Sequence, residues 1–347
     1  MAIFGKLNFR QTGVQQIWAG IICLIAFLCL HVGGATVAAA ERPVLQVAVL
    51  KFGTVSWELD VIRHHGLDKE YGFRLDVTEL ASTQATKVAL MSGSSDMIVS
   101  DWLWVSRQRA SGFDISLVPF SSAAGALIAK RGVRLASIDQ LKGMKIGVAG
   151  GPLDKSWLFL NAFAKKRHGF DLKASTTQVF AAPPLLNQLM IKGDVDVVLN
   201  YWNYSARLEA AGYTRVMEIS DVQQNLTRFE QPAAIIGYTF NEAWAKKNAN
   251  ALDGFFRAAE EAREILFSSD EEWDRIAPLI GASSEEVALT LRQRYREGIP
   301  VMNRDEQVAA SSKLFDVLVK FGGAALVGKS GRLSPGTFWK SSRWPGE

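Results

Sequence analysis

Short apolar runs and amphipathic stretches alternate along most of the chain. Residues 44–50 are rich in β-branched side chains, which is typical of a buried strand, and 57–71 have helical spacing that ends at Gly72. The alternation continues with predicted strands at 74–80, 96–99 and 115–120 and predicted helices at 83–91 and 102–110. A pattern of this kind predicts a largely parallel sheet covered by helices on both faces.

The same pattern restarts after Gly143 and then changes character. The second part has predicted strands at 145–149, 175–180, 195–199, near Val216 and at 233–240, and predicted helices at 155–168, 184–191 and 201–211. From Asn241 onward only amphipathic helices follow, at 241–267, 270–280, 284–297 and 304–321. The last residues, 322–347, are rich in Gly, Ser and Pro and are predicted to form a loosely packed tail.

Two α/β units followed by a helical C-terminal third predict a two-lobed α/β protein. We expect lobe 1 to comprise 41–123 and 235–325, lobe 2 to comprise 124–234, and the tail to comprise 326–347. The chain would then cross between the lobes near 121–128 and again near 230–236. Because ligands of open α/β sheets bind outside the carboxyl ends of the strands, a site is expected where the two lobes face each other.

The first forty residues have the pattern of a secretory signal peptide. Lys6 and Arg10 precede an apolar run of 13 residues at 18–30, and small residues follow up to Ala40. A spanning helix needs about 20 apolar residues, so cleavage before Glu41 is favoured over a permanent anchor, which stays the alternative. The interpretation places the protein in a bacterial periplasm.

Composition agrees with an exported globular protein. Both cysteines, Cys23 and Cys29, lie in the leader, so the rest of the chain has neither a disulfide nor a cysteine nucleophile. The net charge of +4 comes from 39 basic and 35 acidic residues and gives no electrostatic case for nucleic-acid binding.

Polar and aromatic side chains gather at the predicted strand ends. Ser56, Ser82 and Asp101 stand at predicted helix starts, where a cap is the simplest role and an exposed amide could also hold an acceptor group. Gly150 and Gly151 need special backbone angles in a loop that lacks the residues of a phosphate loop.

Aromatic residues next to carboxylates predict the chemistry of the solute. Trp57, Trp102, Trp202, Tyr201 and Tyr204 fall within a few residues of strand ends, where core packing is the alternative for each. The acids Glu58, Asp101 and Asp154 accompany them. Aromatic walls with carboxylates suit a flat heterocycle or an organic cation.

Other classes of site have weaker support in the sequence. Glu58, Asp60, Asp101 and Asp154 could together hold a hard cation, although no compact calcium loop is present. The adjacent histidines His64 and His65 lack the spacing of metal ligands, and no hydrolase, metalloprotease or dinucleotide motif occurs in the right context. Neither a metal site, a cofactor nor an enzymatic activity is therefore expected.

Four segments occur in a distinctive order: HHGLDKEYGFRLDVTEL, KVALMSGSSDMIVSD, LASIDQLKGMKIGVAGG and LNQLMIKGDVDVVLNYWN. Over about residues 44–270 they resemble the periplasmic solute-binding proteins of nitrate/sulfonate/taurine-type ABC importers, the NMT1/THI5-like group with the periplasmic binding protein type II fold. Yeast-type pyrimidine-precursor synthases share this fold, but the cysteine-rich motif associated with them is missing from this sequence.

The resemblance implies that a solute is held at the strand ends of both lobes. The matching positions are Thr54, Ser56, Trp57, Thr83, Ser100, Asp101, Trp102, Ser122, Gly151 and Asp154. Asn200 and Trp202 are expected to add a wall from lobe 2, and Glu58 a carboxylate. Because the acids depart from the pattern of an anion binder, an aromatic, heterocyclic or cationic solute is favoured, with a sulfonate- or nitrate-type anion or a metal ion as alternatives.

The expected function is that of a monomeric periplasmic substrate-binding component that delivers a small solute to an ABC permease and its ATPase in the inner membrane. A periplasmic enzyme acting on a small heterocycle is the alternative of another class. A receptor accessory that presents the solute to a sensor is a third.

Overall fold

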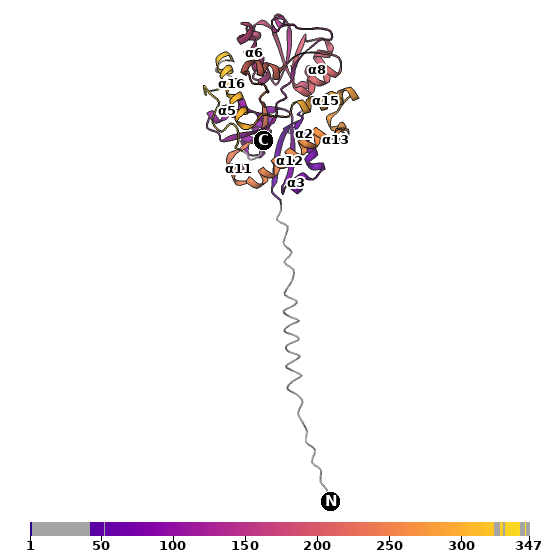
Figure 1. Ribbon diagram of the computed structural model, residues 1–347, viewed down its shortest axis with the longest axis vertical. Coiled ribbons are helices and arrows are strands. Elements are labelled where there is room, and N and C mark those ends of the chain that lie inside the picture. The colour runs from indigo at the N-terminus through magenta and orange to yellow at the C-terminus, as the bar shows by residue number, and fades with distance from the viewer. Residues whose placement is uncertain (2–41, 52, 323–326, 329, 341–343, 345–347) are drawn as a thin grey trace. The chain divides into compact units, whose positions relative to one another are not determined.

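The computed structural model describes residues 1, 42–51, 53–322, 327–328, 330–340 and 344. Contacts along the chain separate Met1–Arg42 from Pro43–Glu347, and the second unit carries the elements drawn in Figure 1. The predicted signal peptide and its cleavage site lie outside the described residues. In the part of the chain that is described, every helix is too short or too polar to cross a bilayer.

Four strands from the first half of the chain and one from the second half form a five-stranded sheet of order β2-β1-β3-β10-β4, which we call the sheet of lobe 1. Its strands are β1 (Val44–Leu50), β2 (Arg74–Leu80), β3 (Met97–Asp101), β4 (Ile115–Ser121) and β10 (Ile236–Asn241). Strand β1 pairs in parallel with β2 and β3, whereas β10 is antiparallel to both β3 and β4. The sheet is thus mixed rather than purely parallel, because β10 enters from the second half of the chain.

A second five-stranded sheet, that of lobe 2, has the order β7-β6-β8-β5-β9. Its strands are β5 (Ala126–Ala129), β6 (Lys145–Ala149), β7 (Thr177–Ala181), β8 (Val197–Asn200) and β9 (Thr214–Glu218). Strand β6 is parallel to β7 and β8, and β5 is antiparallel to β8 and β9. The sequence analysis missed β5, a run of four residues whose pattern is too short to separate from a loop.

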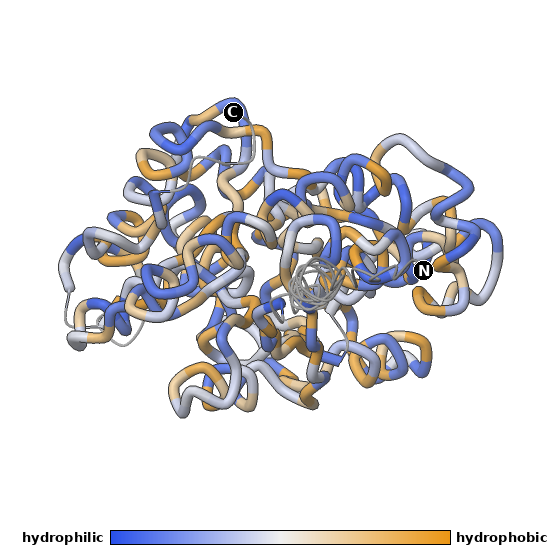
Figure 2. The backbone as a smooth tube through the Cα atoms, turned by 90° about the horizontal axis from the view of Figure 1, so that it is seen from below, coloured by the Kyte–Doolittle hydropathy of each residue, from blue (hydrophilic) through white to orange (hydrophobic). Residues whose placement is uncertain are grey.

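Helices cover both sheets. Those of lobe 1 are α2 (Val55–His64), α3 (Leu67–Glu70), α4 (Thr83–Ser92), α5 (Trp102–Ala110), α11 (Glu242–Lys247), α12 (Ala249–Ser268), α13 (Asp270–Arg275), α14 (Ala277–Ile280) and α15 (Glu285–Glu297). Those of lobe 2 are α6 (Lys155–His168), α7 (Leu172–Ser175), α8 (Pro183–Lys192), α9 (Trp202–Ala210) and α10 (Ile219–Thr227). Figure 2 shows apolar and polar stretches alternating along these elements, as burial of one helix face requires.

Several predicted helices are divided in the structure. The helix expected over 57–71 breaks at Gly66, whose φ of 70° is left-handed, and gives α2 and α3. The long helix expected over 241–267 breaks at Asn248, and the one expected over 270–280 breaks at Ile276. Helix α10, which the sequence analysis missed, follows β9 directly.

The first connection between the lobes is a short extended crossover, Ser122–Gly125. Gly125 has a φ of 105°, and a Cβ on it would lie 2.0 Å from the carbonyl oxygen of Asn200. Only glycine lets the crossover run this close to the end of β8. The second crossover leads from α10 to β10 and is tied to the last helix through Gln307, whose side chain bonds the backbone of Ala234.

The C-terminal region returns to both lobes. Helix α16 (Arg304–Gly322) packs on α6 and α10 of lobe 2, although the sequence analysis groups this stretch with lobe 1. The segment expected to be a loose tail instead packs on β4: Leu117 donates to Thr337 and accepts from Trp339 in backbone hydrogen bonds of 2.9 Å. Trp344 is buried as well, at 4% exposed. The prediction of a loose tail was wrong because it was based on the Gly, Ser and Pro content of the segment, which does not show that single aromatic residues can anchor it.

Candidate functional site

A cavity of about 360 Å³ lies where the carboxyl ends of strands from both sheets face each other. Lobe 1 contributes the ends of β1 and β3 and the first turns of α2, α4 and α5, and lobe 2 contributes the loop after β6 and the start of α9. We call this cavity the cleft. A larger cavity of about 440 Å³ lies between β4, α12 and the segment after α15, away from the strand ends, so the cleft is the candidate site.

Six of the predicted site residues line the cleft. They are Thr54, Thr83, Ser100, Asp101, Asp154 and Trp202. Ser100 is 6% exposed and its Oγ has no hydrogen-bond partner within the described residues. A buried hydroxyl of this kind favours a polar group of a ligand in the cleft.

The other two predicted tryptophans belong to the core. Trp102 is fully buried in a hydrophobic cluster, and Trp57 packs edge-to-face on Trp202 and Trp273 at centroid distances of 5.7 and 5.8 Å. Their positions at strand ends reflect helix packing, and the structure brings neither into the cleft wall.

Glu58 lies away from the cleft in a buried polar cluster. Its carboxylate accepts a 2.5 Å hydrogen bond from the Tyr238 hydroxyl and one of 3.4 Å from Tyr295, and lies 3.7 Å from Nε of Arg263. Burial raises the pKa of Glu58, against the opposing charge of Arg263. The Glu58 carboxylate interacts with side chains of the protein itself and lies outside the cleft, so it is not in a position to neutralise a charged solute.

The remaining predicted residues also find other positions. Ser56 donates to the carbonyl of Gly53, and the buried Asn200 side chain bonds Asn187 and the carbonyl of Pro183. Ser122 lies in the crossover and donates to the carbonyl of Gly298, facing a separate cavity. Gly151 is not part of the cleft lining, whereas its neighbour Gly150 is.

Both acids of the cleft are helix caps. Asp101 accepts from the amide of Trp104 at 2.8 Å at the start of α5. Asp154 accepts from the amide of Ser156 at 2.9 Å at the start of α6. Gly150 keeps this corner narrow, because a Cβ there would lie 2.6 Å from Oδ2 of Asp154. Asp101 therefore has the role of a helix cap, which is one of the two roles that the sequence suggests for it.

Each of these acids also pairs with a lysine. Nζ of Lys87 lies 3.6 Å from Asp101, and Nζ of Lys155 lies 3.4 Å from Asp154. Burial alone would raise the pKa of Asp101, but the ammonium groups of Lys87 and Lys155 outweigh it and hold that pKa below its ordinary value. The Asp101 carboxylate is thus ionised and paired with an ammonium group, and Asp154 also has a lysine beside it.

The lysines occupy the aromatic faces as well. Nζ of Lys87 lies 5.1 Å from the ring centre of Trp104, and Nζ of Lys155 lies 5.0 Å from that of Tyr201. Burial opposes the charge of Lys155, yet Asp154, Tyr201 and Asp101 together outweigh it and raise the pKa of this ammonium. Cation–π contacts expected for a ligand are therefore made by the protein itself.

With Arg107, three basic side chains line the cleft against two acidic ones. The sequence analysis missed Lys87, Arg107, Lys155 and Trp104. A signal was present, since Lys87 lies one helical turn after Thr83 and Lys155 directly follows Asp154. The prediction of the cleft lining considers only residues at the strand ends and omits side chains one helical turn further along.

A metal site is not formed by the predicted acids. Glu58 is buried beside Arg263, Asp60 pairs with Arg275 at 2.6 Å, and the cleft acids pair with lysines. Among the described residues, no group of three His, Cys, Asp or Glu side chains could hold a metal ion.

Comparison with protein families gives a match to the family described as NMT1/THI5 like, over residues 61–272. The chain belongs to the NMT1/THI5-like family. Within this family match lie most of the elements that form the cleft, from the body of α2 to the loop after β6 and the start of α9. Comparison with curated protein sequences gives no significant match.

Solved structures with the same fold cover most of this NMT1/THI5-like chain. The periplasmic aliphatic sulphonate binding protein SsuA from Escherichia coli is 18% identical, with a TM-score of 0.65 over 83% of this chain and 95% of its own. The alkanesulfonate-binding SsuA from Xanthomonas axonopodis pv. citri, bound to MOPS, is 15% identical, with a TM-score of 0.66 over 87% and 100%.

A ligand-binding component of an ABC-type import system from Staphylococcus aureus, with zinc bound, is 12% identical, with a TM-score of 0.65 over 87% and 98%. At these identities the likeness establishes the fold, which is the two-lobed α/β architecture of periplasmic binding proteins predicted from the sequence.

Proposed function

We propose that this protein is the periplasmic substrate-binding component of an ABC importer, which captures a small solute in the cleft and delivers it to a permease. The family membership and the shared fold with importer binding proteins support this role. The cleft between the two sheets is the observation that carries it. The expected partners are a permease and its ATPase in the inner membrane.

Solute capture would proceed by closure of the lobes about the two crossovers. The predicted lobes, 41–123 with 235–325 and 124–234, are the proposed moving bodies except for α16. Because α16 packs on lobe 2, its residues 304–322 would move with 124–234. A solute stabilises the closed form to the extent that it contacts both lobes at once.

The charges of the cleft favour a solute that bears an anionic group. Lys87 and Arg107 from lobe 1 and Lys155 from lobe 2 line it. Its two acids, Asp101 and Asp154, cap helices and each pair with one of the lysines, so the lining has one more basic than acidic side chain. Neither Thr54 at the start of α2 nor Tyr201 at the start of α9 caps its helix with its side chain, and the positive ends of these two helices adjoin the cleft. The geometry therefore supports the anionic alternative over the cationic solute favoured by the sequence.

Aromatic and apolar walls add a second requirement. Trp104 and Phe120 line the cleft from lobe 1, and Trp202 and Leu153 line it from lobe 2. We propose a small organic anion whose flat or apolar body lies against these side chains while its charge faces the lysines.

Calorimetric titration with a matched pair of probes tests this proposal. Benzenesulfonate is expected to bind, and benzyltrimethylammonium, an aromatic cation, is not. Lys155→Met should weaken benzenesulfonate binding by about 10- to 150-fold, equivalent to about 1.5–3 kcal/mol for a charged contact. Lys173→Met, which changes an exposed lysine on α7, is the matched control.

Two results would contradict the proposal. Tighter binding of the cation than of benzenesulfonate would show that the solute is not anionic. Equal loss of affinity in Lys155→Met and Lys173→Met would show that the solute does not bind in the cleft. Recovery of chemically altered probe after incubation with the protein would favour the enzymatic alternative over transport.

A further inference from the structure

Helix α9 belongs to lobe 2 by its neighbours in the chain but packs into the core of lobe 1. Trp202, its first residue, lies 5.7 Å from Trp57 and 6.3 Å from Tyr295, measured between ring centres. Ala206, one turn later, is fully buried in the same cluster. The start of this helix forms a wall of the cleft, so its placement determines the shape of the candidate site.

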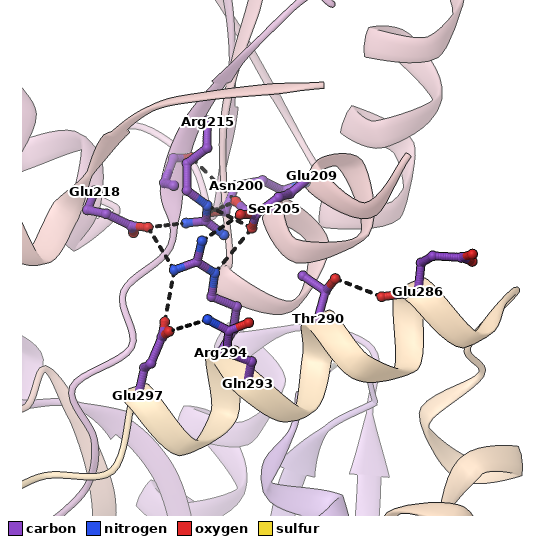
Figure 3. Close-up of polar contacts among 11 residues, drawn as sticks. Asn200, Ser205, Glu209, Arg215, Glu218, Glu286, Thr290, Gln293, Arg294 and Glu297 are labelled. Carbon is purple, nitrogen blue, oxygen red and sulfur yellow. Dashed lines mark hydrogen bonds and ion pairs between the residues drawn. The ribbon is translucent and has the colours of Figure 1, made fainter. Parts of the chain in front are cut away.

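The other end of α9 is held by α15 of lobe 1. Arg294 makes two hydrogen bonds to the carboxylate of Glu209, of 2.5 Å through Nη2 and 3.2 Å through Nε, and Figure 3 shows these groups between the two helices. Glu209 also accepts from Arg215 at 2.9 Å. Burial would raise the pKa of Glu209, but the hydrogen bond from Arg294 and the charge of Arg215 keep it below its ordinary value.

The ionic cluster around Arg294 contains more acids than bases. Glu218 accepts from Arg215 at 2.6 Å, and Glu297 accepts from Arg294 at 2.8 Å. Two guanidinium groups thus face three carboxylates. Loss of Arg294 would leave those three beside Arg215 alone, so like-charge repulsion would drive α9 and α15 apart.

Space exists into which Trp202 could then move. A cavity of about 170 Å³ is lined by Trp202 and by Arg215, Glu218 and Arg294, and it shares Ala123 and Ala124 of the crossover with the cleft. Trp202 is therefore the partition between the cleft and this cavity. A side chain next to an open volume is held by its supports rather than by close packing on every side.

We propose that Arg294 is a positioning residue for solute binding, which holds α9 on α15 so that Trp202 stays in the wall of the cleft. The binding consequence rests on the proposed function, whereas the effect on α9 and Trp202 does not. Arg294 itself does not line the cleft.

The matched control lies on the same helix. Arg292 also forms an ion pair, 3.0 Å from Asp270 of α13, but this pair joins two helices of the same lobe. Arg294→Met and Arg292→Met therefore remove similar groups from α15, and only the first breaks a contact to α9. Glu209→Gln serves as a second variant that keeps the shape of the side chain should Arg294→Met fail to fold.

Two measurements on the ligand-free full chain test the proposal. In Arg294→Met, amide hydrogen exchange in α9 should become faster by about tenfold or more, with α6 as the internal reference. Acrylamide should quench tryptophan fluorescence more strongly, and the increase should disappear when Trp202→Phe is added. Arg292→Met should match the wild type in both. Unchanged exchange in α9, or increased quenching that persists without Trp202, would overturn the proposal.

Binding supplies the third measurement. Affinity for benzenesulfonate should fall about tenfold in Arg294→Met, about 1.4 kcal/mol, and Arg294→Met should cause no additional loss once Trp202→Ala is present. Faster exchange in α9 with unchanged affinity would overturn the positioning role. A wild-type protein that binds neither aromatic probe would instead count against the proposed function, while the ligand-free measurements still decide whether Arg294 holds Trp202.

Discussion

The segment Met97–Trp104 of lobe 1 and the segment Val197–Tyr204 of lobe 2 are built alike but used differently. Each is a buried strand that runs into a helix beginning with tryptophan. Trp102 is fully buried and its indole Nε1 lacks a hydrogen-bond partner in the described residues. Trp202, although it begins a helix of lobe 2, packs on Trp57 and Tyr295 of lobe 1 and lines the cleft.

The residue before each tryptophan accounts for part of the difference. Asp101 caps α5 through its side chain, whereas Tyr201 leaves α9 without a side-chain cap and places its ring beneath Lys155. One strand end therefore stabilises a helix start, and the other supplies an aromatic wall. Position at a strand end does not by itself fix the role of a residue.

The largest effect that tests this comparison is expected from Trp102. Trp102→Ala should lower the free energy of unfolding by about 3–5 kcal/mol, because a large side chain is removed from a closed core. Urea denaturation measures the loss. Trp102→Phe, which keeps most of the volume, should remain folded and bind benzenesulfonate like the wild type. A tenfold weaker affinity in that variant would place Trp102 in the site after all.

A smaller effect is expected at Asp101. Asp101→Ala should cost about 1 kcal/mol of stability through loss of the cap, while Asp101→Asn should retain the cap. Because the folded-state pKa of Asp101 lies below its ordinary value, its ionised form stabilises the fold above about pH 4 and this contribution is lost as pH falls through the folded pKa.

Denaturant titrations between pH 3 and 7 measure that contribution for Asp101. The difference in stability between the wild type and Asp101→Asn should shrink toward the acid end. A difference that grows on acidification would show that the lysines do not stabilise the carboxylate.

The smallest effect is expected at Asp96 and Asp196, which occupy the same position directly before β3 and β8. Each accepts a backbone hydrogen bond of 2.9 Å, from Gln46 and Lys145 respectively, but only Asp196 also pairs with a lysine, Lys130. Burial raises the pKa of Asp96, whereas the amide of Lys145 and the charge of Lys130 lower that of Asp196.

Different effects on stability are therefore expected for the two substitutions. At pH 7, Asp196→Asn should lose about 0.5 kcal/mol, within the range of an exposed ion pair, and Asp96→Asn should lose nothing. The loss for Asp196→Asn should vanish at a pH below its folded pKa. Equal losses of unfolding free energy for both variants in urea denaturation would show that Asp96 and Asp196 contribute alike to stability.

The fold could be predicted from the sequence because its signals are local and repeated. Strand and helix periods identified most elements of both sheets, and the order of four segments identified the family. Strand β5 was not predicted, and β10 was predicted as a strand at 233–240 without its antiparallel pairing. That pairing depends on where the chain returns after a crossover. The packing of Phe338 on β4 depends equally on a contact between distant residues.

The candidate site was predicted less well than the fold. Thr54, Ser100 and Trp202 line the cleft because strand ends converge there, as expected. The charge of the solute could not be inferred, because the sequence shows that Asp101 and Asp154 are acidic but not that each has a lysine and an amide as partners. Pairing of charges is a property of the assembled cleft.

The route of the last residues has a consequence for how the polypeptide acquires its structure. After building lobe 1 helices, the chain passes to lobe 2 as α16 and then returns to β4 beside Leu117. Neither half can be completed before residues 304–340 have left the ribosome, so folding of both halves waits for this stretch of the nascent chain. Truncation before α16 would leave both halves with uncovered apolar surface.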